Sequence, residues 1–217
     1  MIRFAAPCAR ARPLLVKLSA LALALTWLPS VAAETTVVRV EEDWEMVVTN
    51  PDTTTDAPQA TFVISPVSDL SSLHAAFEVN QQTLPSYSPG GLQLQLWDGD
   101  RPIEQRKFPN SAALATPGET VSWTQTMHLA GGNLIFEITS GSSTTWGTFG
   151  GQGYLKIICD TSLANLNSYS PDVSLANSGI GFAANRVQSV VLKAVRLITS
   201  DGQILEDTTP RVLYAQE

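Results

Sequence analysis

Residues 34–217 predict an all-β protein built as a two-sheet antiparallel β-sandwich, and three observations support this prediction. Almost every apolar segment alternates with a two-residue period, the pattern of a strand with one buried face. The segments are short, and connectors rich in Pro, Gly and Ser separate them, as in antiparallel topologies. No amphipathic helix of useful length interrupts them. Because a single sheet of about ten strands tends to curl or split, we expect two packed sheets.

The strands with the strongest alternation lie in the middle of the chain. Over 92–98, three leucines face one way and polar residues face the other, and Asp98-Gly99-Asp100 then ends the strand with turn chemistry. The runs 120–129 and 134–138 flank Gly131-Gly132. With these glycines as a two-residue turn, Leu129 opposes Leu134 and both apolar sets reach one face, so we predict a hairpin.

The remaining elements follow from the same alternation. We predict one helical turn over 161–167, and a strand at each of the following ranges: 36–40, 44–48, 60–65, 73–80, 154–159, 186–199, 203–206 and 211–213.

The first 33 residues are predicted to be a signal peptide that is cleaved. Four basic residues precede an apolar core over 18–28, and Val31-Ala32-Ala33 supplies the small residues of a cleavage site. The apolar run is too short for a stable anchor. We therefore expect a secreted, periplasmic or cell-surface protein that is not inserted in the membrane after cleavage, with residues 34–217 as a single β-sandwich domain.

Acidic residues dominate this domain. It contains all 20 acidic residues but only nine of the 13 basic ones, so its formal charge is −11. Because the nine cations are scattered along the chain, we expect no nucleic-acid partner. Cys159 is the one cysteine after residue 33, which excludes an intramolecular disulfide in the cleaved chain. The strand period over 154–159 turns Cys159 inward, where it acts as a small apolar side chain.

Two segments of the domain resemble concanavalin A-like, laminin-G-type jelly-roll domains. They are the run 146–157, which reads Trp-Gly-Thr-Phe-Gly-Gly-Gln-Gly-Tyr-Leu-Lys-Ile, and the late strand 190–197 followed by Asp201-Gly202. The whole domain also resembles uncharacterised exported bacterial β-sandwich proteins. The resemblance implies a jelly-roll form of the sandwich. Sugar binding, calcium sites, glycan hydrolysis and plain structural roles all occur on that fold, and the fold does not choose among them.

An acidic run, Glu41-Glu42-Asp43-Trp44-Glu45, carries the most specific chemical pattern. On a strand, Glu41, Asp43 and Glu45 share one face at intervals of about 6–7 Å. A retaining glycosidase places its two carboxyl groups about 5–5.5 Å apart. The run resembles the catalytic strand of family 16 glycoside hydrolases, which implies Glu41 as nucleophile, Glu45 as acid/base and Asp43 as the carboxylate that tunes them.

The alternative interpretation of the acidic run is a solvated face, with Trp44 packed inward on the other side. We favour this interpretation for two reasons. The run starts close to the predicted cleavage site, whereas in family 16 a substantial part of the sandwich precedes it. Glu42 also occupies a position that is usually apolar in that family.

Calcium is another use for these carboxylates, because it takes six to eight oxygen ligands. The candidate donors are Glu41, Asp43, Asp98 and Asp100, with the loop 52–56 as a second source. No spacing typical of a transition-metal site is present. We therefore expect no cofactor, with calcium as the alternative.

A polar strand face forms the third candidate site. Aromatic rings stack on sugar rings while amides and carboxylates hydrogen-bond to hydroxyl groups, and such side chains alternate along two predicted strands, with a further tryptophan in a glycine-rich connector. The candidate ligand-binding residues are Trp97, Gln93, Gln95, Glu78, Asn80 and Trp146.

Taken together, the sequence favours a non-catalytic exported module that binds carbohydrate or has a structural role, with a glycan or a surface component as its partner. A retaining glycoside hydrolase using Glu41, Asp43 and Glu45 is the alternative.

Overall fold

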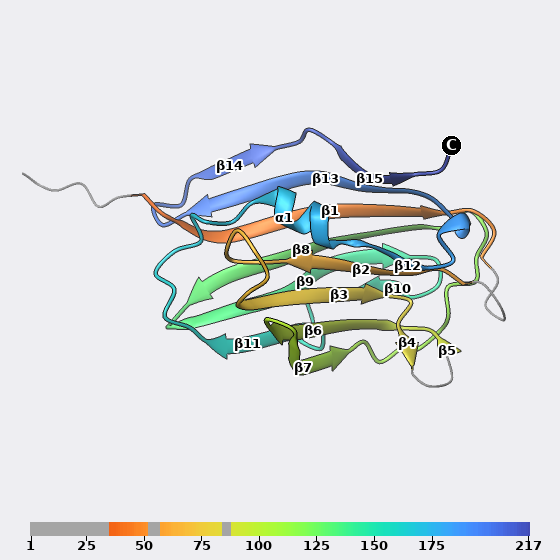
Figure 1. Cartoon of the computed structure of the whole chain (residues 1–217), viewed down its shortest axis with the longest axis horizontal. Coiled ribbons are helices and arrows are strands. Elements are labelled where there is room, and N and C mark those ends of the chain that lie inside the picture. Colours follow the sequence, from red (N-terminus) through yellow and green to blue (C-terminus); the bar gives the residue numbers. More distant parts are fainter. Residues whose placement is uncertain (1–34, 52–56, 84–87) are drawn as a thin grey trace, which may run out of the picture. The chain divides into compact units, whose positions relative to one another are not determined.

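The computed structural model describes residues 35–51, 57–83 and 88–217, which form one β-sandwich (Figure 1). The prediction of two packed antiparallel sheets is confirmed. The predicted signal peptide and the loop 52–56 lie outside the described residues. No helix in the described part of the chain is long and apolar enough to span a bilayer.

The large sheet has the strand order β10–β9–β8–β1–β13–β14, and β11 and β15 pair with β9 and β13. Figure 1 shows β1 and β13, from opposite ends of the described chain, side by side within this sheet. The strands are β1 (Val37–Val48), β8 (Thr120–Ala130), β9 (Asn133–Ser143), β10 (Gly147–Phe149), β11 (Lys156–Asp160), β13 (Val187–Thr199), β14 (Ile204–Asp207) and β15 (Arg211–Ala215).

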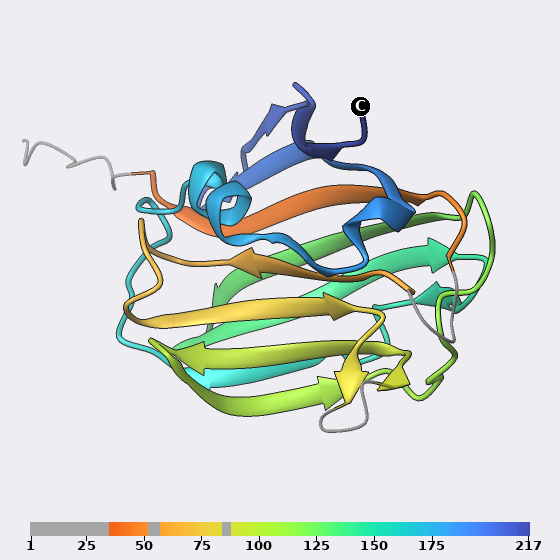
Figure 2. The same ribbon diagram turned by 45° about the vertical axis from the view of Figure 1, so that its right-hand side comes forward.

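The small sheet has the order β12–β2–β3–β6–β7 and packs against the large one, as the turned view in Figure 2 shows. A short pair, β4 and β5, and two helical segments complete the described chain. The elements are β2 (Gln59–Ile64), β3 (Leu73–Val79), β4 (Gln82–Thr83), β5 (Ser88–Pro89), β6 (Leu92–Asp98), β7 (Arg101–Lys107), β12 (Gly179–Phe182), α1 (Pro171–Asn177) and the 3₁₀ turn Ala184–Arg186.

Aromatic side chains join the two sheets at the centre of the core. Trp44 on β1 and Trp123 on β8 come from the large sheet, and Phe62 on β2 comes from the small one. The Phe62 ring centroid lies 5.1 Å from that of Trp44 and 4.5 Å from that of Trp123. All three side chains are buried, and edge-to-face and tilted contacts of this kind add to the gain from burial. The predicted inward orientation of Trp44 is confirmed.

The predicted hairpin is observed in the expected register. Gly131-Gly132 connects β8 to β9, and Leu129 pairs with Leu134 while Met127 pairs with Phe136. Both glycines have positive φ, at 59° and 81°, which a two-residue hairpin turn requires. The alternation of the two strands was therefore sufficient to predict their pairing.

Several elements differ from the prediction. The short strands β4, β5, β10 and β12, of two to four residues each, were not predicted. The ranges 36–40 and 44–48 form one continuous strand, β1, because the acidic residues between them keep the two-residue period. Strand β7 is almost entirely exposed, so no apolar alternation marks it. The helical turn lies at 171–177 and not at 161–167, because Ser170 caps the helix through the backbone N–H of Asp172 and Pro171 follows at its first position.

The segment before and within α1 is tied to the inward face of β1 by a buried carboxyl group. Glu42 is fully buried and accepts hydrogen bonds from the hydroxyls of Tyr169 and Ser174, each at 2.6 Å. Its other oxygen accepts from Gln125 at 2.6 Å and from the Trp44 indole at 2.9 Å. Burial raises the pKa of Glu42. This carboxyl group belongs to the interior and lies on the face of β1 opposite the acidic row.

Candidate functional site

The acidic row of β1 lies on the outer face of the large sheet, as predicted. Glu41, Asp43 and Glu45 are directed outward because they alternate with the buried residues of the same strand. β1 is flanked by β8 on one side and β13 on the other, so side chains of three strands meet on this face. The row is therefore part of a larger polar surface.

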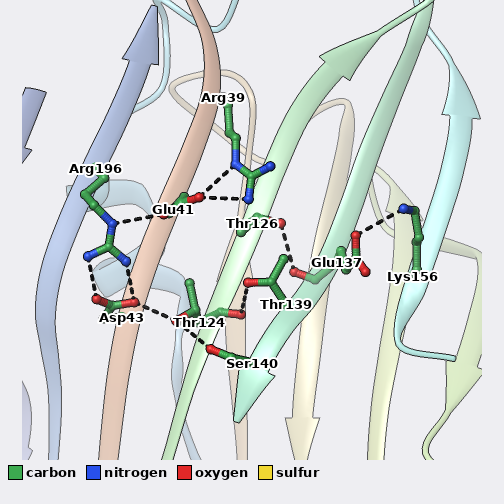
Figure 3. Close-up of polar contacts among 10 residues, drawn as sticks. All are labelled: Arg39, Glu41, Asp43, Thr124, Thr126, Glu137, Thr139, Ser140, Lys156 and Arg196. Atoms are coloured by element: carbon green, nitrogen blue, oxygen red, sulfur yellow. Dashed lines mark hydrogen bonds and ion pairs between the residues drawn. The ribbon is translucent and has the colours of Figure 1, made fainter. Parts of the chain in front are cut away.

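An arginine from the far end of the chain pairs with two of the three carboxylates in the row (Figure 3). Arg196 on β13 donates to Asp43 through both terminal nitrogens, at 2.7 and 2.9 Å, and to Glu41 through Nε at 2.9 Å. Arg39 donates to the other oxygen of Glu41 at 2.8 Å. Both oxygens of each carboxylate are thus occupied by guanidinium groups, a bidentate arrangement in the case of Asp43. These contacts, with those to Asp43 first, raise the pKa of Arg196.

Hydroxyl groups continue the polar surface across β8 and β9. Thr124 donates to Asp43 at 2.7 Å, and Ser140 donates to Thr124 at 3.1 Å (Figure 3). One step further along the strands, Ser122 and Ser142 lie 3.1 Å apart. A chain of hydrogen bonds therefore runs across the sheet from β9 to β13.

These side chains line an open hollow of about 420 Å³, which we call the sheet hollow. Glu45 and Lys193 form its remaining charged pair, at 3.4 Å. Trp44 and Trp123 border it, but they are only 1% and 3% exposed and present no ring face. The lining is Asp43, Trp44, Glu45, Ser122, Trp123, Thr124, Ser140, Gly141, Ser142, Lys193 and Arg196.

The same face continues beyond the sheet hollow toward the other end of the strands. Glu137 on β9 pairs with Lys156 on β11 at 3.2 Å (Figure 3). His128 on β8 pairs in register with Arg39 on β1. Burial, and then the charges of Arg39 and Lys156, lower the pKa of His128, which favours its neutral form.

Four of the predicted ligand-binding residues lie together on the outer face of the small sheet. Glu78 on β3 pairs with Gln93 on β6, whose amide donates to it at 3.0 Å. Trp97 donates to Gln95 at 2.9 Å and its ring stacks on His74 at a centroid distance of 6.5 Å. Burial raises the pKa of Glu78. The predicted grouping of Glu78 with the three β6 side chains is therefore observed, but Gln93 is only 1% exposed and is not accessible to a ligand.

The other two predicted ligand-binding residues lie in the interior. Asn80 is fully buried; it donates to the carbonyl of Pro58 at 2.7 Å and accepts from the backbone N–H of Leu114 at 3.0 Å. Trp146 is 3% exposed and donates to the carbonyl of Ala112 at 2.6 Å. Both side chains hold loops against the sandwich, so neither is accessible to a ligand. Their polar groups are satisfied internally, which the sequence pattern did not indicate.

The acidic row and the polar face that carries Gln93, Gln95 and Trp97 do not form one cleft, because they lie on the outer faces of different sheets. The same separation divides the candidate calcium donors. Glu41 and Asp43 lie on β1, whereas Asp98 and Asp100 lie at the turn between β6 and β7. Among the described residues, no group of three or more His, Cys, Asp or Glu side chains is arranged to hold a metal ion.

No protein-family model matches the chain, and no curated protein matches it. Solved structures do match. One is Scytalido-glutamic peptidase with a peptide-based transition-state analog, at 12% identity and a TM-score of 0.32, covering 82% of this chain and 85% of that one. Another is SCP-B, a member of the eqolisin family of peptidases, with the tripeptide Ala-Ile-His, at 13% identity and a TM-score of 0.29, covering 82% and 84%.

These matches correct the function expected from the sequence. The structures found are described as peptidases, and neither is a carbohydrate-binding module, a structural module or a glycoside hydrolase. The site geometry agrees with the correction. Glu41 and Asp43 are held by arginines, so neither is free to act as nucleophile or proton donor in glycoside hydrolysis. At TM-scores of 0.32 and 0.29, the matches do not assign peptidase activity to this chain.

Proposed function

We propose that the sheet hollow binds a short stretch of polypeptide. The observation that supports this is its lining of hydroxyl groups and paired opposite charges. Ser and Thr hydroxyls both donate and accept, and so match the alternating N–H and C=O groups of a peptide backbone. The volume of about 420 Å³ lies within the usual range of about 300–1,000 Å³ for ligand sites.

The charges of the sheet hollow favour a ligand that carries polar groups but little net charge. Asp43 is balanced by Arg196, and Glu45 is balanced by Lys193. A polyanion would meet the two carboxylates, and a polycation would meet the two basic groups. A peptide that carries both acidic and basic side chains can form ion pairs with the members of both charged pairs, and this electrostatic complementarity gives specificity.

A sugar ring would lack its usual contact in the sheet hollow, because Trp44 and Trp123 present no exposed ring face. A peptide does not need such a contact. At TM-scores of 0.32 and 0.29, the peptide ligands of the two compared proteins carry no weight for the ligand of this chain. The proposal of a peptide ligand is based on the chemistry of the lining.

Two further properties belong to the proposal. We propose that the chain is exported, with cleavage before Glu34, because of its basic leader and apolar core. We also propose that the sandwich is of the concanavalin A-like, jelly-roll kind, in keeping with the placement of β1 beside the late strand β13. N-terminal sequencing of the protein secreted from the full-length gene tests the first; we expect Glu34, and Met1 would contradict it.

The binding test uses residues 34–217 and a library of fluorescein-labelled hexapeptides, read by fluorescence polarisation. Arg196→Met should weaken the best binder by at least about tenfold, because it removes charge-assisted contacts and frees Asp43. Thr124→Val, which keeps the shape but removes the hydroxyl, should weaken it by a few fold. Mass spectrometry of the same mixtures detects any cleavage.

Arg106→Met is the matched control, because Arg106 is paired with Glu104 at 2.6 Å on the small sheet, away from the sheet hollow. It should leave peptide binding unchanged. The proposal is wrong if no peptide binds, or if Arg196→Met and Arg106→Met bind alike while circular dichroism shows both to be folded.

A further inference from the structure

A second hollow, of about 290 Å³, lies on the outer face of the small sheet, and we call it the tryptophan hollow. It shares no residue with the sheet hollow, which lies on the other sheet. The neighbouring strands β2, β3 and β6 contribute most of its lining, and the loop before β3 and the turn after β6 complete it. The lining is Thr61, Val63, Leu70, His74, Ala76, Trp97, Gly99 and Asp100.

The floor of the tryptophan hollow is apolar. Ala76 on β3 pairs in register with Val63 on β2, and each is only 5% exposed. Because the alanine side chain is a single methyl group, it leaves a depression among the larger side chains around it. Leu70, from the loop before β3, adds a further apolar side chain to the lining. A floor of this kind favours a ligand that presents C–H groups to it.

Two aromatic rings lie side by side in the lining. His74 and Trp97 are cross-strand neighbours, and their rings stack at a centroid distance of 6.5 Å and an interplanar angle of 14°. The indole N–H of Trp97 donates to Gln95 at 2.9 Å, which fixes the orientation of the ring. Since this polar atom already has its partner, Trp97 offers a ligand its π surface. Among aromatic side chains, tryptophan attracts cations most strongly.

A negative charge lies at the rim of the tryptophan hollow. Asp100 is exposed, and its carboxylate forms no hydrogen bond or ion pair with the described residues. The next residue, Arg101, pairs in register with Asp98 and so shares the face opposite to Trp97. No Lys or Arg belongs to the lining. The formal charge of −11 on residues 34–217 adds a long-range attraction for cations.

We propose that the tryptophan hollow binds a quaternary ammonium group of the trimethylammonium kind. Trp97 and Asp100 attract its positive charge, and its methyl groups pack on the apolar floor. A primary ammonium group would bring three N–H donors, which an apolar floor leaves unsatisfied at a cost, whereas a trimethylammonium group brings none. The volume lies close to the lower limit of about 300 Å³ for ligand sites, which suits a small molecule or a headgroup. Because the two hollows lie on different sheets, this site is independent of the proposed peptide site.

The test is an NMR titration of residues 34–217 with choline, followed through the indole N–H signal of Trp97. Saturable shifts of this signal are expected, with little change in the indole signals of the buried Trp44 and Trp123. The alcohol 3,3-dimethylbutan-1-ol has the shape of choline without its charge, and ethanolamine carries a primary ammonium group. Each should bind at least about tenfold more weakly. No saturable shift with choline, or equal binding of either probe, would overturn the proposal.

A trimethylammonium group can come from a free small molecule or from the headgroup of a lipid. Sedimentation with phosphatidylcholine vesicles distinguishes the two sources. Sedimentation that choline competes away assigns the headgroup, and choline binding without sedimentation assigns the free molecule; either result supports the proposed ligand group. Sedimentation that neither choline nor Trp97→Leu reduces would overturn the headgroup as the source.

Variants separate the contributions of the ring and the carboxylate, with binding measured through the broadening of the choline methyl signal. Trp97→Leu keeps an apolar side chain but removes the π surface, and should weaken choline binding at least about fivefold. Trp97→Phe, whose ring attracts cations less strongly, should fall between this variant and the wild type. Asp100→Asn should weaken binding by a few fold, and by less at high salt.

Asp98→Asn is the matched control, because it removes a carboxylate from the same turn that does not line the tryptophan hollow. It should change choline binding little. The assignment is overturned if Trp97→Leu and Asp98→Asn bind choline alike while circular dichroism shows both to be folded.

Discussion

Replacing Glu42 by glutamine should change how the stability of the sandwich depends on pH. Glu42 is fully buried, and its four hydrogen-bond donors, from Trp44, Gln125, Tyr169 and Ser174, are all uncharged. Burial raises its folded-state pKa above the ordinary value of 4.5, and the hydrogen bonds oppose the shift only in part. The native state therefore binds this proton more tightly than the unfolded state does.

The sign of the effect follows from linkage. For a carboxyl group with a raised folded pKa, the stabilisation is complete below the unfolded pKa and is lost as the pH rises from about 4.5 through the folded pKa. The slope reaches about −1.4 kcal/mol per pH unit for one proton. The amide that replaces the carboxyl group in Glu42→Gln does not titrate. The free energy of unfolding of the wild type minus that of Glu42→Gln should thus decrease as the pH rises above about 4.5.

Urea unfolding at pH 4 to 8, monitored by tryptophan fluorescence, measures this difference. The contributions of all other titrating groups cancel in it, because both proteins contain them. The variant Glu42→Ala allows a second prediction, of the loss in the free energy of unfolding. It leaves four donors buried without their acceptor, at about 1–3 kcal/mol each, so a loss of about 3 kcal/mol or more in the free energy of unfolding is expected at pH 5. A wild-type minus Glu42→Gln difference that is constant from pH 4 to 8 would refute the reasoning.

Two further predictions concern other parts of the large sheet. A Cβ added to Gly141 would clash with the Phe149 ring, so Gly141→Ala should lower the free energy of unfolding by about 1–3 kcal/mol. Gly179→Ala is the control and should change it little, because the space around Gly179 is open. Equal thermal unfolding of the two variants would contradict this prediction. Arg39→Met should raise the pKa of His128 by removing a nearby positive charge, as measured by NMR titration, with the one other histidine of the chain as internal control; an unchanged value would contradict the assignment.

The sequence predicts strands well wherever one face is apolar and the other polar. The leucines of β6 and the β8–β9 hairpin were assigned with the correct facing and register. β7 was missed because an exposed edge strand buries too little to leave an alternation. The helix was misplaced because its start is marked by the Ser170 cap followed by Pro171, and the prediction did not use this signal.

The sequence predicted the acidic side chains of the candidate site but not their partners. The facing of Glu41, Asp43 and Glu45 follows from the strand period. Their partner does not: Arg196 is 153 residues from Asp43 along the chain, and the pairing of β1 with β13 has no local signature. The hydroxyls of Ser140 and Ser142 were likewise missed, because the predicted strand ends at residue 138 whereas β9 continues to Ser143. Asn80 and Trp146 show the reverse error, since polar groups bonded internally look like binding groups in a sequence.

The pairing of β1 with β13 also bears on how the chain reaches its native state. The bond between Glu41 and Arg196 spans 155 residues, so the centre of the large sheet cannot form until nearly the whole chain is available. Contacts so distant in sequence make folding slow, since loop closure precedes the gain from pairing. A chain still emerging from its ribosome, or from a translocation pore, would hold β1 without its partner. Delayed folding of this kind would suit the export proposed above, in which the chain passes through a narrow channel.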